Sequence, residues 1–370
     1  MRLLICAGGT GGGVYPALTV LQALGNEADP VLWVGGEGGM ESDLVTRTGI
    51  PFEAIPAAGV HGVGLKNLPG NLWKLFRGWK ASRQILRKFN PDAVFFTGGY
   101  VAVPMALAAL NKPTLLYVPD IEPGLALRVL ARFSNKIALT AEESNAFMKD
   151  QAKTFVSGYP TRPGLAKWSR SSACSVLNLD PDRKVLLVFG GSKGARSINR
   201  AVLAVLPDLL QEMQVVHITG SLDWEEVSSR AEQLAPEIAS SYHPFAYLHE
   251  EMGAALAAAD LAVSRAGASV LGEFPLFGLP AILVPYPYAW RYQKVNAEFL
   301  VKHQAAMLLE NEQLPARLLA TIQSLIRDDS RLSEMKKAML ALSRPDAASK
   351  IAAALSNLAA KTSRSSGGAA

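Results

Sequence analysis

The 370-residue sequence contains only two cysteines, Cys6 and Cys174, which lie in opposite halves of the chain. Two distant cysteines, one of them inside an apolar run, are typical of reduced packing residues in a cytosolic protein rather than of a disulfide framework. The five histidines are scattered, so no Cys/His cluster has the spacing of metal ligands. The HExxH and GKS/GKT motifs are missing as well. These absences speak against a zinc protease and a P-loop ATPase, and we expect no metal or cofactor.

Long hydrophobic runs are also scarce. Every strongly apolar stretch is interrupted by proline, glycine or a charge before it reaches the length of a membrane span. The chain enters a predicted strand directly after Met1, so no secretory signal is expected. Hydrophobic residues nevertheless make up 49% of the chain and charged residues 19%, which indicates globular domains with substantial cores. A chain of this length is comfortable for two domains, and its net charge of +5 is only mildly basic.

Acidic residues are absent from one long segment, between Glu53 and Asp92. The segment is basic and aromatic, and within it Leu72, Phe76 and Trp79 share one face of a predicted helix. An apolar, aromatic face with a cationic rim is typical of a helix that lies in an anionic membrane surface. An amphipathic helix that buries these rings in its own core explains the pattern about as well. A nucleic-acid partner is not expected, because no recognised binding motif accompanies the charge.

The central motif of the chain is KVLLVFGGSKGAR, residues Lys184–Arg196. An apolar run of strand length ends at two glycines and continues into a predicted helix, which leaves backbone N–H groups at the positive end of a helix dipole. Such a turn binds phosphate, although an ordinary strand–helix turn has the same pattern. RLLICAGGTGGGVYP, residues Arg2–Pro16, repeats the design at the start of the chain. The sequence therefore predicts two similar α/β domains that face one another.

Short apolar runs that alternate with helical patterns predict a parallel sheet in each half. The expected strands are Leu3–Cys6, Val31–Val34, Ala93–Thr97 and Thr114–Val118, then Val185–Phe189, Val215–Thr219, Leu261–Ser264 and Ala281–Val284. Ligands of such sheets bind at the carboxyl ends of the strands. Candidate binding loops in the first half are therefore Gly8–Gly13, Gly98–Tyr100 and Pro119–Gly124.

The domain boundary is expected in VSGYPTRPG, residues Val156–Gly164, where glycine and proline cluster. We expect an N-terminal domain over 1–160, a C-terminal domain over 161–345, a final helix over 346–362 and a disordered tail over 363–370. An arginine in the linker, Arg162, reaches a ligand held between two domains or simply faces solvent. In the second half, Glu273 is placed to accept ribose hydroxyls, and Gln293 and Asn296 follow an aromatic loop suited to sugar recognition.

With these motifs assembled, the chain resembles the family of peripheral membrane glycosyltransferases that add N-acetylglucosamine to lipid I to give lipid II. The motifs that carry the resemblance run in family order from GGTGG at Gly8–Gly12, through GGSKGARSIN, HITG and SRAGASVLGE (Gly190–Asn199, His217–Gly220 and Ser264–Glu273), to Asn296 and Ala297. The resemblance implies a GT-B fold of two Rossmann-like domains with parallel sheets facing a cleft. It also implies an inverting, metal-independent hexosyltransferase of peptidoglycan synthesis, held peripherally on the cytoplasmic face of the cell membrane. Its partners would be UDP-N-acetylglucosamine, an undecaprenyl-linked lipid acceptor and an anionic membrane surface.

The same resemblance implies roles for individual residues. His249 would meet uracil with Met252 nearby, Glu273 would hold the ribose and Gln293 would read the sugar. The donor-binding set is Thr10, Gly11, Gly12, Asp120, Arg162, Gly191, Ser192, His249, Met252, Ala268, Ser269, Glu273 and Gln293. The acceptor side would include Gly13 and Tyr100, next to Thr10–Gly12, and the membrane contact would include Leu72, Phe76 and Trp79.

Three positions depart from the family pattern. Gly13 stands where the family has a histidine often proposed as the general base, and Tyr117–Asp120 stands where the family reads HEQN. The loop before Gln293 carries aromatic residues in place of a polar, histidine-containing sequence. Asp120 is the best substitute for the base, although helix capping or a loop hydrogen bond explains an aspartate at this position more simply. A related transferase with another lipid acceptor, and a catalytically weak UDP-sugar-binding scaffold at the membrane, therefore stay open as alternatives.

Overall fold

The computed structural model describes residues 1–8, 11–39, 41–58, 68–191, 194–288 and 292–366. The chain forms two compact units, one of Met1–Arg162 with Pro345–Ala370 and one of Pro163–Arg344. The two crossings between the units, at residues 162–163 and 344–345, both fall within an Arg-Pro pair. Each unit is described by itself.

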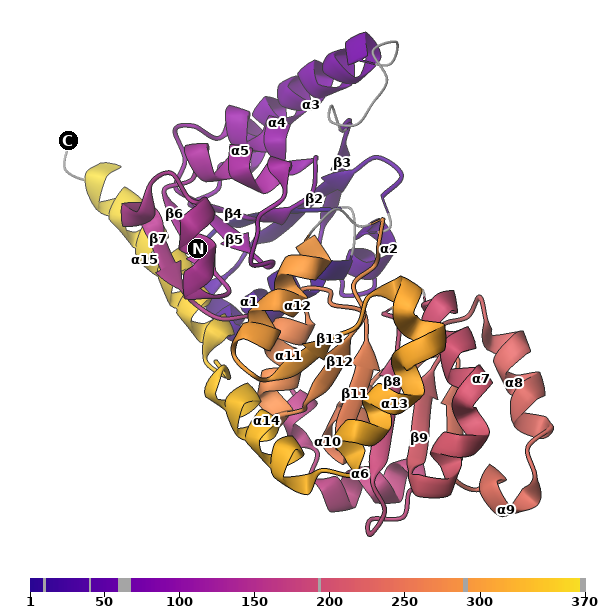
Figure 1. The fold of residues 1–370 in the computed structure, drawn as a ribbon. Helices are drawn as coiled ribbons and strands as arrows, with labels where there is room; N and C mark the ends of the chain where they lie inside the picture. The colour runs from indigo at the N-terminus through magenta and orange to yellow at the C-terminus, as the bar shows by residue number, and fades with distance from the viewer. Residues whose placement is uncertain (9–10, 40, 59–67, 192–193, 289–291, 367–370) are drawn as a thin grey trace. The chain divides into compact units, whose positions relative to one another are not determined.

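The first unit is built on a seven-stranded sheet in which every pair of neighbouring strands is parallel. The strands in spatial order are β3 (Phe52–Ile55), β2 (Val31–Gly36), β1 (Leu3–Ala7), β4 (Ala93–Gly98), β5 (Thr114–Val118), β6 (Lys136–Leu139) and β7 (Thr154–Val156). The helices are α1 (Gly11–Leu24), α2 (Glu41–Thr46), α3 (Leu68–Phe89), α4 (Ala102–Ala108), α5 (Leu125–Phe133) and α15 (Ala347–Ser366). Figure 1 shows these helices on both sides of the sheet, as in a Rossmann fold.

The second unit repeats the design with a six-stranded parallel sheet. The strands in spatial order are β10 (Tyr242–Phe245), β9 (Gln214–Ile218), β8 (Val185–Phe189), β11 (Leu261–Ser264), β12 (Ala281–Leu283) and β13 (Ala306–Leu308). The helices are α6 (Arg170–Leu177), α7 (Arg196–Glu212), α8 (Trp224–Glu232), α9 (Pro236–Ala239), α10 (Met252–Ala258), α11 (Val270–Phe277), α12 (Tyr292–Lys302), α13 (Leu314–Ile326) and α14 (Asp329–Ala341). The prediction of two parallel-sheet α/β domains is confirmed.

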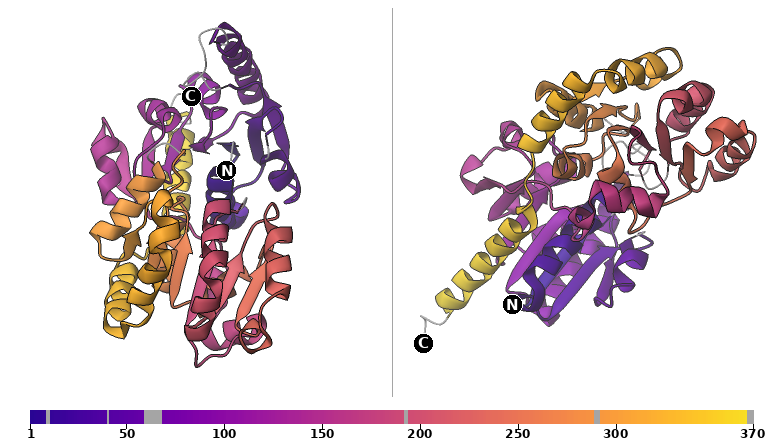
Figure 2. Two further views of the ribbon diagram at one scale, coloured as in Figure 1. Left: turned by 45° about the vertical axis from the view of Figure 1, so that its right-hand side comes forward. Right: turned by 90° about the horizontal axis from the view of Figure 1, so that it is seen from below.

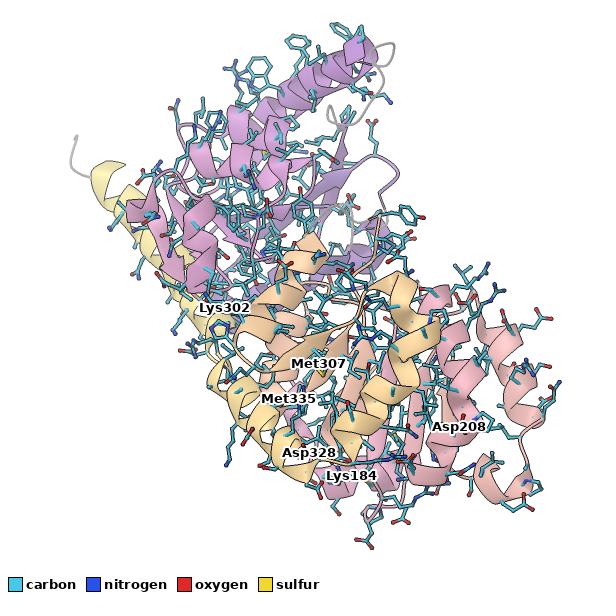
Figure 3. All side chains as sticks on the ribbon, viewed as in Figure 1. Lys184, Asp208, Lys302, Met307, Asp328 and Met335 are labelled. Atoms are coloured by element: carbon cyan, nitrogen blue, oxygen red, sulfur yellow. The ribbon has the colours of Figure 1, made fainter. Side chains whose placement is uncertain are left out.

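The core of the second unit lies between its sheet and the helices α7, α13 and α14. Apolar side chains on every third or fourth residue of α7, such as Ile198, Val202 and Leu206, meet β8 and β9 in this layer. Figure 3 labels Met335 of α14, which is buried in the same core, and Met307 of β13, which packs against it. The first unit has an equivalent core around β1, β4 and β5.

The last helix, α15, returns to the first unit and packs against α1, β4 and β5 (Figures 1 and 2). Ser356 of α15 also donates a hydrogen bond of 2.7 Å to Glu27. The helix runs to Ser366, four residues past the point where the sequence predicted disorder to begin. The physical reason is that no glycine or proline interrupts the helical sequence before Gly367.

Helix α3 belongs to the sheet over only part of its length. Gly78, Ser82 and Ile85 form its buried face, and the helix packs there against α4 and β3. The first two turns extend beyond the sheet and carry side chains that project into solvent (Figures 1 and 3). The exposed aromatic residues therefore lie on a projecting part of α3, a helix that contains no acidic residue.

Candidate functional site

The glycine loop after β8 is shaped by close backbone contacts. Gly194 has φ +76°, and a Cβ there would lie 2.1 Å from the carbonyl oxygen of Thr219. Only glycine fits, so the loop is held against the end of β9. The loop leads directly into α7, whose first residue is Arg196 and whose preceding residue makes no side-chain cap. Free N–H groups of α7 are therefore available to an anion at this edge of the sheet. Gly191, predicted to bind the donor, is in this loop, whereas Ser192 lies outside the described residues.

A chain of polar side chains, all of them buried except Arg196, supports the first turn of α7. Its members, in order, are Tyr242, His217, Asn199, Asp223 and Arg196, joined by hydrogen bonds of 2.8, 3.0, 2.8 and 2.8 Å. Complete burial lowers the pKa of His217 to about 3, so the ring is neutral at physiological pH. This network fixes the orientation of Arg196, whose guanidinium is largely exposed beside the glycine loop.

The sugar-recognition residues predicted from the sequence lie at the start of α12. The backbone N–H of Tyr286 donates to Oε1 of Gln293 at 2.9 Å, which leaves the NH₂ group of that amide as the side available to a ligand. Asn296 is fully buried and donates to the carbonyl of Ala266 at 3.1 Å, so it joins α12 to the turn after β11. Asn296 therefore acts on the site through the backbone rather than by contact with a sugar.

Ala268, Ser269 and Glu273 come together at the amino end of α11. The turn formed by residues 267–269 precedes the helix, and Glu273 is part-exposed in the first helical turn. His249 is exposed after β10, and its ring lies 4.6 Å from that of Tyr247. Met252 is the first residue of α10, and its side chain is buried. All of these positions lie at the carboxyl edge of the second sheet, the edge where parallel sheets bind ligands.

Two glycine loops of the first unit touch each other. Gly99 has φ +87°, and a Cβ on it would lie 2.5 Å from the carbonyl oxygen of Gly8. Gly13 is buried in the first turn of α1, where its carbonyl accepts a hydrogen bond of 2.7 Å from the Thr97 hydroxyl. The structure thus joins the loops after β1 and β4 at one edge of the sheet. Gly11 and Gly12 begin α1 there, whereas Thr10 lies outside the described residues.

The loop after β5 carries the candidate base. Asp120 is part-buried two residues past the end of the strand. Burial, followed by the effects of Tyr159 and Asp120, raises the pKa of Tyr117 well above its usual value. The Tyr117 hydroxyl is hydrogen-bonded to Thr140 at 2.8 Å, and a different carboxylate, Glu122, is buried in an ion pair of 2.7 Å with Arg128. Asp120 is therefore the carboxylate of this loop that is more open to solvent.

Two further predicted residues lie near this edge. Tyr100 is half-exposed directly after β4. Arg162, at the end of the first unit, places its guanidinium carbon 5.6 Å from the centre of the Tyr15 ring of α1. The linker arginine is thus held against the helix that follows the first glycine loop.

The sequence argument missed several residues that the fold brings to these sites. Glu41 is a buried carboxylate that accepts the Gly36 N–H at 2.8 Å and lies against Gly8. Arg265 donates hydrogen bonds to the segments that follow β12 and β13 in the second unit. No local pattern marks either residue, because their importance comes from neighbours distant in sequence. Among the residues described by the structure, no group of three His, Cys, Asp or Glu side chains is arranged to hold a metal ion.

The projecting turns of α3 form an apolar surface, which we call the α3 patch: Leu72, Trp73 and Phe76, with exposed fractions of 54%, 61% and 51%. These side chains are not in the core of the unit. Trp79, which the helical-face argument included, is only part-exposed, and its ring stacks on Phe76 at 5.9 Å. Trp73 was missed because it lies one position off that face. No described helix has the length and apolar character needed to cross a membrane.

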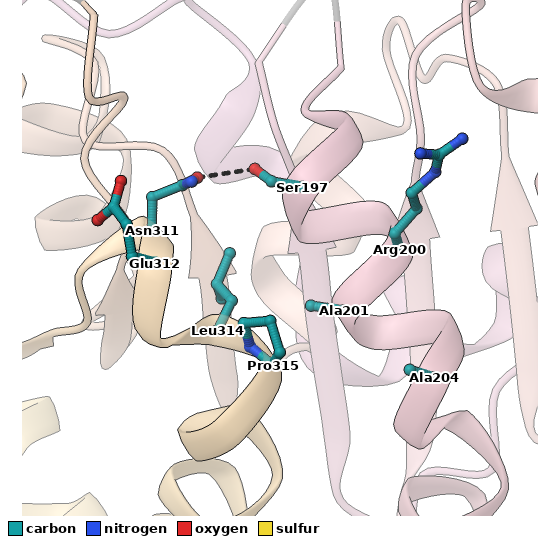
Figure 4. Close-up of a pocket in the computed structure, with 8 residues that line it drawn as sticks. All are labelled: Ser197, Arg200, Ala201, Ala204, Asn311, Glu312, Leu314 and Pro315. Atoms are coloured by element: carbon teal, nitrogen blue, oxygen red, sulfur yellow. Dashed lines mark hydrogen bonds between the residues drawn. The ribbon is translucent and has the colours of Figure 1, made fainter.

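The described residues also form a pocket of about 460 Å³ between α7 and the start of α13 (Figure 4). Its lining residues are Ser197, Arg200, Ala201, Ala204, Asn311, Glu312, Leu314 and Pro315. Figure 4 shows the hydrogen bond of 2.7 Å from Ser197 to Asn311 at one end of it. The pocket lies beside the glycine loop but holds none of the predicted site residues.

Two Rossmann-like units, each with glycine loops and helix starts gathered at one sheet edge, define a nucleotide-sugar-binding protein of the two-domain glycosyltransferase class. Residues 3–139 match the glycosyltransferase family 28 N-terminal domain and residues 185–351 match the glycosyltransferase family 28 C-terminal domain. The chain belongs to the family of UDP-N-acetylglucosamine–N-acetylmuramyl-(pentapeptide) pyrophosphoryl-undecaprenol N-acetylglucosamine transferases.

The relatives match over nearly the whole chain. The enzyme of that name from Roseiflexus sp. (strain RS-1) is 38% identical, with 97% of this chain and 95% of the relative covered. The Desulforamulus reducens enzyme is 36% identical, with 95% and 97% covered. The crystal structure of Acinetobacter baumannii MurG superposes with a TM-score of 0.76 at 24% identity, over 96% of this chain and 99% of that one, which shows a shared fold.

Proposed function

We propose that this protein transfers N-acetylglucosamine from its UDP conjugate to an undecaprenyl-pyrophosphoryl N-acetylmuramyl-pentapeptide, a glycosyl transfer of peptidoglycan synthesis. The observation that carries the proposal is the identity of 36–38% to enzymes of that name along almost the full length of both chains. Both family domains are matched, and the motifs GGSKGARSIN and SRAGASVLGE are present in the second unit.

The second unit supplies the chemistry of donor binding. The loop after β8 and the starts of α7 and α11 offer backbone N–H groups to a diphosphate. We assign the ribose hydroxyls to Glu273 and a sugar hydroxyl to the NH₂ group of Gln293, whose Oε1 already accepts the N–H of Tyr286. Stabilising the charge that develops on departing UDP is the main task of such a site, because UDP leaves as an anion.

The first unit supplies the acceptor side. The attacking hydroxyl of the acceptor must lose its proton as the new glycosidic bond forms, and the electron pair of the old bond leaves with UDP. Gly13 has no side chain to take this proton, whereas Asp120 is a part-exposed carboxylate at the same sheet edge. We assign the role of general base to Asp120.

The α3 patch supplies membrane contact. It is surrounded on α3 by basic residues and by no acidic ones, so it combines apolar area with attraction to anionic lipid. Such a surface would hold the enzyme where its lipid-linked acceptor resides, as a peripheral protein on the cytoplasmic face. Nucleotide sugars are cytoplasmic metabolites, so the donor would reach an enzyme on the cytoplasmic face of the membrane.

The test of the proposed function is UDP release from UDP-N-acetylglucosamine with and without a water-soluble lipid I analogue. Release that depends on the analogue, together with a product heavier by one N-acetylhexosamine, is the expected result. If an unrelated lipid-linked sugar stimulates UDP release and the lipid I analogue does not, the protein uses a different acceptor.

One observation favours a second candidate function. Gly13 removes the side chain that the family pattern places beside the acceptor, while the donor motifs are kept. A UDP-sugar-binding protein at the membrane with little transferase activity would show this combination. Such a protein would release no UDP with the lipid I analogue in the experiment above, and it would bind UDP in a separate titration.

Replacing Glu273 by alanine is expected to weaken UDP binding by about tenfold or more. The lost hydrogen bonds involve a charged acceptor, and such bonds contribute roughly 1.5–3 kcal/mol. Titration of UDP followed by calorimetry measures the change, and Glu237→Ala on exposed α9 is the matched control. An unchanged UDP affinity in a folded Glu273→Ala protein removes the ribose assignment.

A further inference from the structure

Arg265 makes four side-chain hydrogen bonds within the second unit. It follows β11, and its side chain reaches the ends of two further strands and the start of α7. Nη1 donates to the carbonyls of Val284 and Pro285 at 3.1 and 3.2 Å and to Oδ1 of Asn311 at 3.0 Å, and Nη2 donates to the Ser197 hydroxyl at 2.8 Å. The Tyr286 ring lies over the guanidinium at 5.3 Å. This side chain therefore ties together backbone segments that border the donor site.

Every one of these partners is electrically neutral. No described carboxylate lies within ion-pair distance of Arg265, and the residues outside the described ranges contain no aspartate or glutamate. Burial lowers the pKa of Arg265, but an arginine side chain stays protonated under physiological conditions. The Glu312 carboxylate partly offsets this effect by raising the pKa from beyond ion-pair distance, so the direct partners of this half-buried charge are carbonyl, amide and hydroxyl groups.

Such an arrangement is costly for an empty protein and favourable for one that binds an anion. A buried positive charge in a protein is normally paired with a carboxylate, because the cost of removing it from water is otherwise uncompensated. Arg170 of this unit follows that rule, because it is paired with Asp260 at 3.1 Å. Arg265 differs, and it lies at the edge where the loops proposed to hold a diphosphate begin.

We propose that Arg265 is a positioning residue for the donor site, whose unpaired charge also attracts the diphosphate of the nucleotide-sugar. It holds Pro285 and Tyr286, which lead to Gln293, and Ser197 in the first turn of α7. The absence of a carboxylate partner leaves its positive field available to the ligand. This inference rests on the proposed function, because it takes UDP as the ligand of this edge.

Asn311 offers a direct test, because Asn311→Asp changes charge with little change of shape. Its Oδ1 already accepts hydrogen bonds from Arg265 and from Ser197 (Figure 4), and an aspartate oxygen accepts both in the same way. The variant therefore keeps the contacts of Arg265 but gives its charge a partner. UDP affinity is expected to fall about tenfold, the effect of one unit charge at roughly 10 Å in a medium of effective permittivity ~20.

The ligand series separates charge from structure. Calorimetry with UDP, UMP and uridine should show a loss that shrinks with the charge of the ligand, and raised salt should reduce it. The control is Asn357→Asp, at an exposed position of α15 in the other unit, which makes the same change in net charge. This variant should bind all three ligands like the wild type. Arg265→Lys keeps the charge without the branched contacts, so it should impair UDP and uridine alike.

The outcomes are distinct. Equal binding of UDP by Asn311→Asp and the wild type overturns the inference, as does an equal loss for UDP, UMP and uridine, which would indicate a structural role alone. A wild-type protein that binds no UDP overturns the proposed function instead.

Discussion

Replacing Asp120 by asparagine is expected to lower kcat by about 10²–10⁴-fold, because a positioned general base contributes an effect of this size. Asparagine has the shape of aspartate but cannot take the proton of the acceptor hydroxyl. UDP binding should change little, since asparagine keeps the size of aspartate and one of its acceptor oxygens. Steady-state transfer to a lipid I analogue, with a separate UDP titration, measures both quantities. Glu37→Gln, at an exposed carboxylate after β2 of the same sheet, is the matched control.

Restoring a histidine at position 13 completes this test. A Cβ on Gly13 would have its nearest neighbour, the Thr97 carbonyl oxygen, at 3.4 Å, which is an ordinary van der Waals contact. The local backbone therefore has room for a Cβ at position 13. If Asp120 is the base, the protein should show measurable turnover without the Gly13→His substitution. If Asp120→Asn keeps the wild-type rate while Gly13→His raises it by orders of magnitude, the chain is a form of the enzyme that lacks its base.

Replacing Leu72, Trp73 and Phe76 by serine is expected to reduce binding to anionic vesicles by about 30-fold to 1,000-fold. Full burial of one large apolar side chain contributes roughly 1.5–3 kcal/mol, and these three are half-exposed, so their joint contribution is about 2–4 kcal/mol. Co-sedimentation with vesicles of mixed neutral and anionic lipid measures the loss. The basic residues of α3 should leave a weak, salt-sensitive remainder.

The control for the α3 patch is an equally exposed apolar residue elsewhere. Val176 of α6 in the second unit has an exposed fraction of 52%, and Val176→Ser should bind vesicles as the wild type does. UDP binding should be normal in both variants. A patch variant that is folded and still sediments with vesicles contradicts the assignment of membrane contact to α3.

The sequence predicted the interior of both sheets and missed their outer strands. The eight predicted strands correspond to β1, β2, β4 and β5 in one sheet and to β8, β9, β11 and β12 in the other, all in the middle of their sheets. Middle strands of a parallel sheet are covered on both faces, so they read as continuous apolar runs. The missed strands β3, β7, β10 and β13 lie at the edges, where exposed faces admit polar residues. The remaining one, β6, begins with the exposed Lys136.

The candidate site divides in the same way. Glycine loops after strands were visible in the sequence, because the residues that form each loop are consecutive. Arg265 and Glu41 were not, since each depends on backbone groups or glycines that other loops bring to it. Trp73 was missed for a smaller reason, because a helical wheel assigns faces but does not show where a helix leaves its domain.

The sequence by itself determined the two α/β halves, the glycine loops after β1 and β8, and the basic, acid-free helix. These properties follow from local patterns: burial on both faces of a strand, glycines at its end, and charge along one helix. The tertiary structure decided which side chains project from α3, which unit receives α15, and that Arg265 has only neutral partners. Those properties depend on contacts between residues far apart in the chain, and no local pattern specifies such contacts.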